Sequence, residues 1–275
     1  MKIIKSPLRY PGSKQKFCET LKNILDKNNI RSELFIEPFA GGASISLFML
    51  QNDLTEKIAL IEKDPLLASF WKVVFFDSDW LISEIEKLNI NLETWQYFKN
   101  YSPRTIRKKA LKCLFMNRTC FSGILKAGPI GGQNQSSQYT IDCRFNKENI
   151  INKIRILSTY KNRIEFIEEG DYEIILKEKI LNLPDKTFFY FDPPYVNKAK
   201  GLYNFYFDNQ DHYRLKDFIK VLDYNWLLSY DFEPSLNDLY KGFSKCGFFN
   251  TTYTTASNCR LNKQEFLATN LKLLI

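Results

Sequence analysis

Four consecutive residues, Asp192, Pro193, Pro194 and Tyr195, combine groups that can hold a flat amine. They follow the apolar and aromatic run TFFYF at 187–191, which has the composition of a buried strand. The prolines fix the backbone and lack N–H groups, so the carbonyl between them can only accept a hydrogen bond. With the Asp192 carboxylate it provides two fixed acceptors, which suit an –NH2 group with two protons. Tyr195 adds a face on which a heterocycle can stack.

A second group of residues, EPFAGGAS at 37–44, is typical of a turn between a strand and a helix. Gly41 and Gly42 would let a ligand approach the backbone closely. Glu62 lies 20 residues after Gly42, at the end of the next predicted strand, where an acid can bind ribose hydroxyls. A glycine turn alone is weak evidence, because the pattern is FAGGAS and not GxGxxG. Together, the turn and the acid predict a nucleoside cofactor.

The segment RYPGSK at 9–14 is a third candidate. It lacks the first glycine of a Walker motif, which argues against a P-loop. Tyr10 could offer an aromatic face, and Lys14 could offer a positive charge to a carboxylate. Taken alone, the segment could equally be a plain turn with a surface lysine.

Composition excludes several classes of protein. His212 is the only histidine of 275 residues, which argues against a histidine-rich metal site and a Ser-His-Asp triad, so no metal is expected. The six cysteines show no CxxC spacing, and we expect reduced thiols. No apolar run is long enough to cross a bilayer, and the first residues, MKIIKSPLRYPGSK, have no secretory h-region. These observations favour a cytoplasmic protein with no membrane partner.

The positive charge is concentrated in one block. Residues 99–163 hold 14 Lys and Arg residues against two acids, a net charge of +12, whereas the rest of the chain holds 25 bases and 29 acids. Such a block attracts polyanions by releasing their counterions, although a solvated helix face could have the same composition.

Strand-like and helical stretches alternate along the chain and predict an α/β fold with a doubly wound parallel sheet. Strands are expected within 32–37, 57–62, 164–169, 186–191 and 225–231, with a closing hairpin from 248–256 and 264–275. Helices are expected within 14–25, 43–50, 65–76, 80–89, 103–118, 146–160, 172–176 and 211–222, with Asn146 or Asn149 as a cap of one of them, and 122–146 reads as an extended loop.

The spacing of the two chemical motifs predicts an insertion. Three β-α units of roughly 30 residues would separate Gly42 from the fourth strand by about 90 residues. The distance from Gly42 to Asp192 is 150 residues, which leaves a surplus of the same size as the basic block. We therefore expect the α/β core to be interrupted by a basic insertion between about residue 70 and about residue 160.

With these motifs in order, the sequence resembles the alpha group of DNA adenine-N6 methyltransferases, the family of the bacterial DNA adenine methylase and many restriction-system methylases. RYPGSK resembles its N-terminal cofactor motif, EPFAGGAS its S-adenosylmethionine loop, NRTCFSG at 117–123 the start of its target-recognition domain, and DPPY its catalytic motif. DHYRL at 211–215 and RLNKQEFLATN at 260–270 are similar to further family segments. Two departures are Glu62, where relatives often have Asp, and residues 124–145, which differ from GATC-specific members and leave the recognised bases open.

The resemblance implies a Rossmann-like methyltransferase core with an inserted, mostly helical, basic target-recognition domain. The core would comprise 1–70 and 158–275 and bind S-adenosylmethionine, and 71–157 would bind DNA. The implied cofactor-binding residues are Tyr10, Lys14, Glu37, Pro38, Phe39, Ala40, Gly41, Gly42, Glu62, Lys63, Asp171, Tyr172 and Asp192. The implied catalytic residues are Asp192, Pro193, Pro194 and Tyr195, and the implied DNA-binding residues are Arg9, Asn117, Arg118, Ser122, Lys126, Arg144 and Arg260.

The implied function is site-specific methyl transfer from S-adenosylmethionine to N6 of an adenine flipped out of double-stranded DNA. The enzyme would serve a restriction-modification system, with a cognate restriction endonuclease as a possible partner. Three alternatives stay open at this point: a solitary regulatory methylase, an enzyme for cytosine N4, RNA adenine or a glutamine amide, and a non-catalytic nucleic-acid-binding module on the same fold. DPPY favours DNA adenine over cytosine or protein glutamine by analogy with the family, and the intact cofactor motifs argue against a non-catalytic module.

Overall fold

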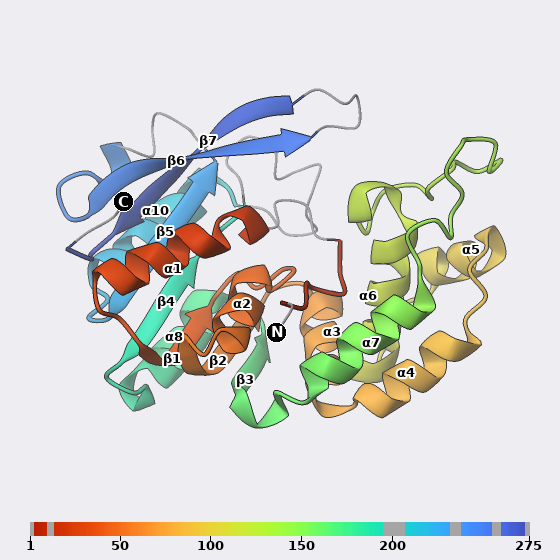
Figure 1. The fold of residues 1–275 in the computed structure, drawn as a ribbon, viewed down its shortest axis with the longest axis horizontal. Helices are drawn as coiled ribbons and strands as arrows, with labels where there is room; N and C mark the ends of the chain where they lie inside the picture. Colours follow the sequence, from red (N-terminus) through yellow and green to blue (C-terminus); the bar gives the residue numbers. More distant parts are fainter. Residues whose placement is uncertain (1–2, 10–13, 195–206, 232–237, 255–259, 273–275) are drawn as a thin grey trace.

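A seven-stranded sheet forms the centre of the computed structural model, which describes residues 3–9, 14–194, 207–231, 238–254 and 260–272 (Figure 1). The strand order is β3-β2-β1-β4-β5-β7-β6. The strands are β1 (Ser32–Glu37), β2 (Thr55–Glu62), β3 (Ile164–Glu169), β4 (Thr187–Phe191), β5 (Asn225–Asp231), β6 (Lys245–Thr254) and β7 (Arg260–Thr269). The first five run parallel, and β7 lies antiparallel between β5 and β6. The predicted doubly wound sheet and the closing hairpin are confirmed.

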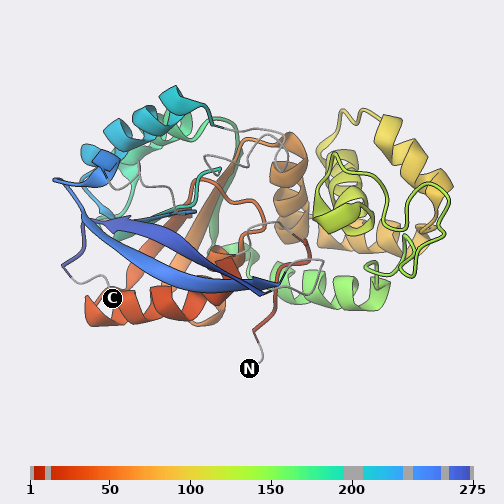
Figure 2. The same cartoon turned by 90° about the horizontal axis from the view of Figure 1, so that it is seen from above.

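Helices flank the sheet and gather beyond its β3 edge (Figures 1 and 2). The α-helices are α1 (Cys18–Lys27), α2 (Ser44–Gln51), α3 (Pro65–Phe76), α4 (Ser78–Lys87), α5 (Leu92–Asn100), α6 (Ile106–Thr119), α7 (Lys147–Ser158), α8 (Tyr172–Lys179) and α10 (Asn209–Lys220). Short 3-10 turns are η1 (Lys14–Lys16), η2 (Phe121–Gly123), η3 (Lys161–Arg163) and η4 (Ile180–Asn182). Between η2 and α7 the chain has no further helix or strand, as predicted for the extended loop.

The central strands are apolar on both faces because both faces are covered. Phe35, Tyr190 and Leu267 face the core that contains α1, α2 and the helices from α3 to α7. Their neighbours in sequence point the other way, and Ile36 and Phe189 pack with α8 and α10. This alternation explains why the strands read as continuous hydrophobic runs without a polar face.

Five helices, α3 to α7, lie between β2 and β3, where the insertion was expected. The helix α3 contacts both β3 and α6, so it joins the sheet to the remaining inserted helices. The predicted domain boundary at 70 and 71 falls within α3, and the division into two domains stays a prediction. Helix α5 was not predicted, because it is short and buries only Trp95 and Phe98.

The helix starts follow local capping rules. Asp64 accepts a hydrogen bond from the Leu66 N–H, and Pro65 begins α3. Thr105 caps α6 in the same way, and Asn146 caps α7 by accepting from the Asn149 N–H. Of the two predicted caps at this position, Asn146 is therefore the correct one.

Candidate functional site

Three predicted acids lie at the carboxyl edge of the parallel strands. Strand β1 ends at Glu37, β2 ends at Glu62, and Asp192 follows the last residue of β4. The order β2-β1-β4 places these ends side by side, and the chain direction of the crossovers reverses between β1 and β4. In open α/β sheets, ligands bind at this reversal point, beyond the carboxyl ends of the strands.

The glycine turn after β1 is fixed by Glu62. The Gly41 N–H donates to Glu62 Oε2 over 2.8 Å, and the Asp64 N–H donates to Oε1 over 2.9 Å. Gly41 has a φ of 45°, in the left-handed region that favours glycine. The Trp71 indole N–H of α3 donates to the Gly41 carbonyl over 2.9 Å. The turn is therefore preorganised by its own protein contacts, and burial raises the pKa of Glu62 to about 7.

Glu37 is buried beneath the same turn. Its Oε2 accepts hydrogen bonds from the backbone N–H and the hydroxyl of Ser46 in α2. Burial raises its pKa to about 8, and the nearby charges of Asp192 and Glu62 act in the same direction. The side chain is therefore mainly protonated at neutral pH, and it anchors the start of α2 to β1.

Asp192 is held by groups from two other parts of the chain, and a third part holds its lysine partner. Lys14 Nζ lies 3.0 Å from Asp192 Oδ1, and the Ser229 hydroxyl donates to the same oxygen over 3.2 Å. Lys14 Nζ also lies 3.1 Å from Glu265 Oε2, on β7. Burial raises the pKa of Asp192 to about 6, although the Lys14 charge opposes the rise. Both the Lys14 contact and the Ser229 contact are made to Oδ1.

The rest of the predicted catalytic segment is only partly described. Pro193 is buried and Pro194 is half-buried, directly beyond β4. Tyr195 lies outside the described residues, so its stacking role stays a prediction.

The third predicted corner of the cofactor site forms around α8. Asp171 caps this helix by accepting from the Glu173 N–H over 3.1 Å. Tyr172 packs against Phe39 from the glycine turn, with ring centroids 5.0 Å apart. Arg214 of α10 completes the corner, because its Nη2 lies 2.7 Å from Asp171 Oδ2 and its guanidinium lies 5.6 Å from the centre of the Tyr172 ring.

The other predicted cofactor-binding residues divide into three groups. Pro38, Ala40 and Gly42 are buried within the turn. Lys63 is exposed, and its Nζ lies 3.7 Å from Asp171 Oδ2. Tyr10 lies outside the described residues.

Three of the predicted DNA-binding arginines form a cluster. Arg9 comes from the N-terminal segment, Arg118 from α6, and Arg144 from the loop before α7. Burial lowers the pKa of Arg118 to about 10, and the charges of Arg9 and Arg144 lower it further. Within the described residues, Arg9 Nη1 and Arg118 Nε are buried without a hydrogen-bond partner. A cluster of guanidinium groups with unused donors is suited to bind an anion such as a phosphate.

Asn117, also predicted to bind DNA, is fully buried and bonded within the protein. Its Oδ1 accepts from the Arg9 N–H over 2.7 Å, and its Nδ2 donates to the carbonyls of Arg9 and Gly123 over 3.1 and 2.9 Å. Gly123 passes so close that a Cβ would lie 1.9 Å from the Arg9 carbonyl oxygen. Asn117 therefore joins α6 to the N-terminal segment, and its amide is not available for DNA.

The remaining predicted DNA-binding residues are less informative. Ser122 and Lys126 are exposed on the turn and loop after α6, where DNA could reach them. Arg260 is the first residue of β7, and its side chain lies outside the described part of the structure.

Much of the basic block is neutralised by acids from other segments. Arg107 pairs with Asp77, Lys108 with Glu84, and Lys109 with Glu169. Arg163 similarly pairs with Asp53. The net charge of +12 therefore overstates the positive charge that is available to bind DNA. The arginine cluster is where that available charge is most concentrated.

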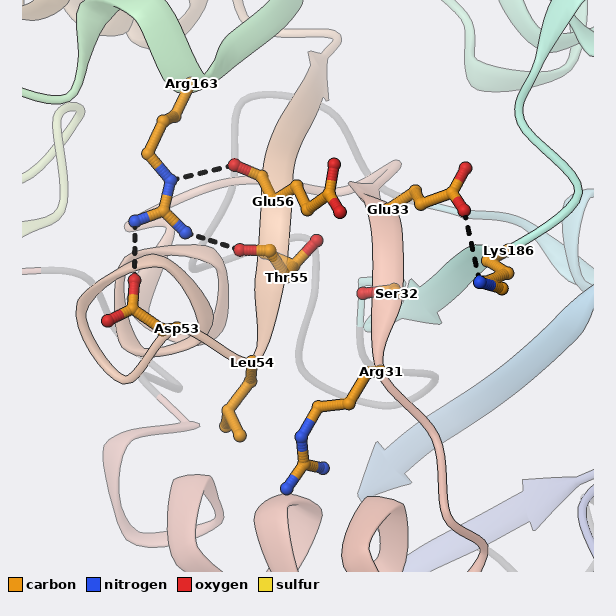
Figure 3. Close-up of a pocket in the computed structure, with 9 residues that line it drawn as sticks. All are labelled: Arg31, Ser32, Glu33, Asp53, Leu54, Thr55, Glu56, Arg163 and Lys186. Atoms are coloured by element: carbon orange, nitrogen blue, oxygen red, sulfur yellow. Dashed lines mark hydrogen bonds and ion pairs between the residues drawn. The ribbon is translucent and has the colours of Figure 1, made fainter.

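Figure 3 shows a pocket of about 570 Å³ at the opposite end of the sheet. Two of its bases at the strand ends are engaged with protein groups: Arg163 with Asp53 and three backbone carbonyls, and Lys186 with Glu33. It lies at the amino ends of β1 and β2, where the sheet geometry does not predict catalysis.

The described residues also bear on the expectations of no metal site and no membrane span. Among the described residues, no group of three or more His, Cys, Asp or Glu side chains could hold a metal ion. No described helix is long and apolar enough to span a bilayer.

Glu265, Ser229 and Arg214 were not identified from the sequence. Glu265 is 251 residues from Lys14, and no local pattern links them. Glu265 nevertheless carries a signal, because it is an acid at an inward-facing position next to the apolar run FLA. An acid at such a position needs a buried partner.

Comparison with known proteins gives a consistent result. Residues 10–262 match the family described as D12 class N6 adenine-specific DNA methyltransferase. The chain is 28% identical over 269 residues to Type II methyltransferase M.MjaIII of Methanocaldococcus jannaschii, covering 88% of this chain and 89% of that protein. It is 25% identical over 242 residues to Type II methyltransferase M.CviBI of Paramecium bursaria Chlorella virus NC1A, covering 87% and 88%.

Two solved structures were also matched. An rRNA methyltransferase, aviRa, from Streptomyces viridochromogenes has a TM-score of 0.43 and 10% identity, over 98% of this chain and 89% of that chain. A precorrin-6y methyltransferase from Geobacter metallireducens has a TM-score of 0.36 and 10% identity, over 91% and 87%.

Proposed function

We propose a role in catalysis for individual residues of this chain. The premise is that the chain belongs to the D12 class N6 adenine-specific DNA methyltransferase family. The protein is accordingly a DNA adenine methyltransferase that uses an S-adenosylmethionine-type methyl donor. The family and its Type II relatives support an enzyme of the restriction-modification type.

The residues at the carboxyl edge fit S-adenosylmethionine as the donor. A preorganised glycine turn and Glu62 suit a nucleoside, and the aromatic pair of Phe39 and Tyr172 suits an adenine ring. Asp171 lies beside this pair, where its carboxylate could accept from the adenine amino group. The bound donor supplies an electrophilic methyl group on a positively charged sulfur, and an edge that contains several carboxylates favours that charge.

Asp192 and the Pro193 carbonyl would hold the two amino protons of the target adenine. The N6 lone pair is delocalised into the ring, so fixed acceptors that direct both protons outwards make it more available for attack. Transfer of the methyl group leaves N6 positively charged, and one of its protons then passes to Asp192 Oδ2. Tyr195 would stack on the flipped base and recover about 1–3 kcal/mol of the cost of unstacking.

The inserted helices would present the DNA. The cluster of Arg9, Arg118 and Arg144 would bind backbone phosphates, and side chains of the loop 122–146 would reach base edges. On this proposal 71–157 acts as the target-recognition domain and the substrate is double-stranded DNA, found in the cytoplasm of a bacterial host. Both relatives are named Type II methyltransferases, which favours a cognate restriction endonuclease for the same site as the partner. A solitary methylase is the alternative.

The observation that carries the proposal is that Lys14 and Ser229 both contact Oδ1 of Asp192, which within the described residues keeps Oδ2 for a ligand beside the preorganised glycine turn. Asp192→Ala should reduce single-turnover methyl transfer by roughly 100-fold or more while DNA affinity, measured by fluorescence anisotropy, changes little. The control is Asp185→Ala, an exposed acid before β4 at the other end of the sheet. An Asp192→Ala enzyme that methylates at the wild-type rate would disprove the catalytic assignment.

A further inference from the structure

One buried lysine is shared between two carboxylates at the catalytic edge. Lys14 Nζ lies 3.0 Å from Asp192 Oδ1 and 3.1 Å from Glu265 Oε2. The side chains of Lys14 and Glu265 are 3% and 4% exposed. The three groups come from η1, from the end of β4 and from β7, so the fold as a whole brings them together.

The position of Glu265 has no evident purpose in packing. On β7, Phe266 and Ala268 face one core, while Leu267 faces the other core together with Phe17 and Tyr190. Glu265 lies on the same face as Leu267, at a buried position where an apolar residue would cost nothing to desolvate. Replacing a buried ion pair by apolar residues is often neutral or stabilising, so packing alone does not account for an acid here.

The charges around Asp192 show what Glu265 can do. Burial raises the pKa of Glu37 to about 8, and it raises the pKa of Tyr190 and Tyr230 well above the usual value, so these three groups are mainly neutral at pH 7. Ser229 is neutral. Among the described residues, the charged groups that act on Asp192 are therefore Lys14 and Glu265. Without Glu265, the charge of Lys14 would be shared with one carboxylate fewer.

A lysine that no longer shares its charge with Glu265 would weaken Asp192 as an acceptor. The carboxylate must attract the amino protons of the target adenine and then take one proton from the methylated, positively charged N6. If the positive charge of Lys14 beside Oδ1 is not shared, it opposes both steps. A lysine charge that is shared with a second carboxylate opposes them less. The same lysine, held from two sides, also fixes the orientation of the carboxylate.

We propose that Glu265 is a positioning residue that keeps Asp192 a strong proton acceptor by taking part of the charge of Lys14. This inference rests on the proposed role of Asp192 as the acceptor for the target amine. It adds a residue of the C-terminal hairpin to the apparatus for methyl transfer.

The test is the pH dependence of single-turnover methyl transfer with saturating DNA and S-adenosylmethionine. Glu265→Gln keeps the shape of the side chain and removes its charge. The acidic limb of the rate profile should move to lower pH by roughly one unit, because Asp192 would lose a proton more easily, and the plateau rate should fall by about tenfold. Gln264→Ala, an exposed neighbour on β7, should leave the limb in place. A Glu265→Gln limb at the wild-type pH, with only the melting temperature changed, would show that the residue is merely structural.

A double variant gives a result of the opposite sign. Lys14→Met with Glu265→Gln removes both partners, and the loss of the larger influence, that of Lys14, should move the acidic limb above its wild-type pH. This variant leaves no lysine unpaired, so it also serves if Glu265→Gln does not fold. A limb at or below the wild-type position would overturn the inference.

Failure of the inference can be told apart from failure of the proposed function. If Asp192→Ala is inactive but the Glu265 variants show no shift, only the role of Glu265 is wrong. If Asp192→Ala is active, the catalytic assignment itself is wrong.

Discussion

The two functional regions of this chain concentrate opposite charges in unfavourable surroundings. At the carboxyl edge of the sheet, burial raises the pKa of Glu37, Glu62 and Asp192, which favours their neutral forms. In the arginine cluster, burial and mutual repulsion lower the pKa of Arg9 and Arg118. One region is therefore short of positive charge and the other is short of negative charge.

Each deficit matches the proposed ligand of its region. A sulfonium donor would bring a positive charge to the carboxylates, and DNA would bring phosphates to the arginines. Part of the binding free energy would then come from relieving repulsion that already exists in the free protein. On the proposed function, the contrast between the two regions is that of one site suited to a cation and another suited to a polyanion.

The largest expected effect concerns the pH dependence of stability. The acids at the carboxyl edge have pKa values near neutrality, whereas the arginines of the cluster do not. Acids whose folded pKa is raised destabilise the fold as pH rises through that pKa, so stability should fall between pH 5 and pH 8. Glu37→Gln should abolish its share of this loss, on the order of 3 kcal/mol, as measured by urea unfolding across this range. Glu33→Gln, on the same strand at the opposite edge, should keep the wild-type slope. An unchanged slope in Glu37→Gln would mean that this acid is not buried in its charged form at high pH.

A smaller effect is expected at the link between the regions. Asn117→Ala removes three hydrogen bonds to the chain, and it leaves the Arg9 N–H and two carbonyls without that partner. The free energy of unfolding should fall by about 2 kcal/mol. DNA affinity should fall as well, because Arg9 would no longer be held beside Arg118. A variant with wild-type stability would show that water or another group replaces the amide.

The smallest effect compares Arg118, whose Nε has no hydrogen-bond partner among the described residues, with Arg107, which pairs with an acid. Arg118→Ala should weaken DNA binding by about 1 kcal/mol and reduce the slope of log affinity against log salt by about one. Arg107→Ala is the matched control, because Arg107 already pairs with Asp77. Titrations between 50 and 200 mM salt would compare the two variants, over the range in which affinity depends steeply on salt. Equal slopes for both variants would place the phosphates elsewhere on the insertion.

Local patterns were sufficient to predict most elements and the edge where the acids meet. Strands that end in Glu37, Glu62 and Asp192 can be identified from apolar runs followed by acids, and parallel strands bring such ends together. The basic insertion was predicted from the motif spacing together with the charged block at 99–163. Helix α5 escaped prediction because its buried stripe consists of two residues, although Asn91 gave a capping signal.

Roles that depend on distant partners were not predictable. The contact of Lys14 with Glu265 joins distant parts of the chain, and the apolar run beside Glu265 indicates that this acid needs a partner but not that the partner is Lys14. Asn117 was assigned to DNA, yet it follows Ala110 and Leu114 on the buried face of α6, at a spacing that helical periodicity could have revealed. Sequence motifs thus located the edge where these residues meet better than they indicated what each residue contacts.

The short stretch from Arg9 to Lys14 is held at both of its ends. Asn117 bonds its first residue to the inserted helices, and two carboxylates bind its last residue next to the sheet. Five residues of extended chain reach at most about 18 Å, so this length is the upper limit of the distance between the two anchored ends. A rearrangement that moved α6 further than this from the carboxyl edge would have to break one of the two sets of contacts.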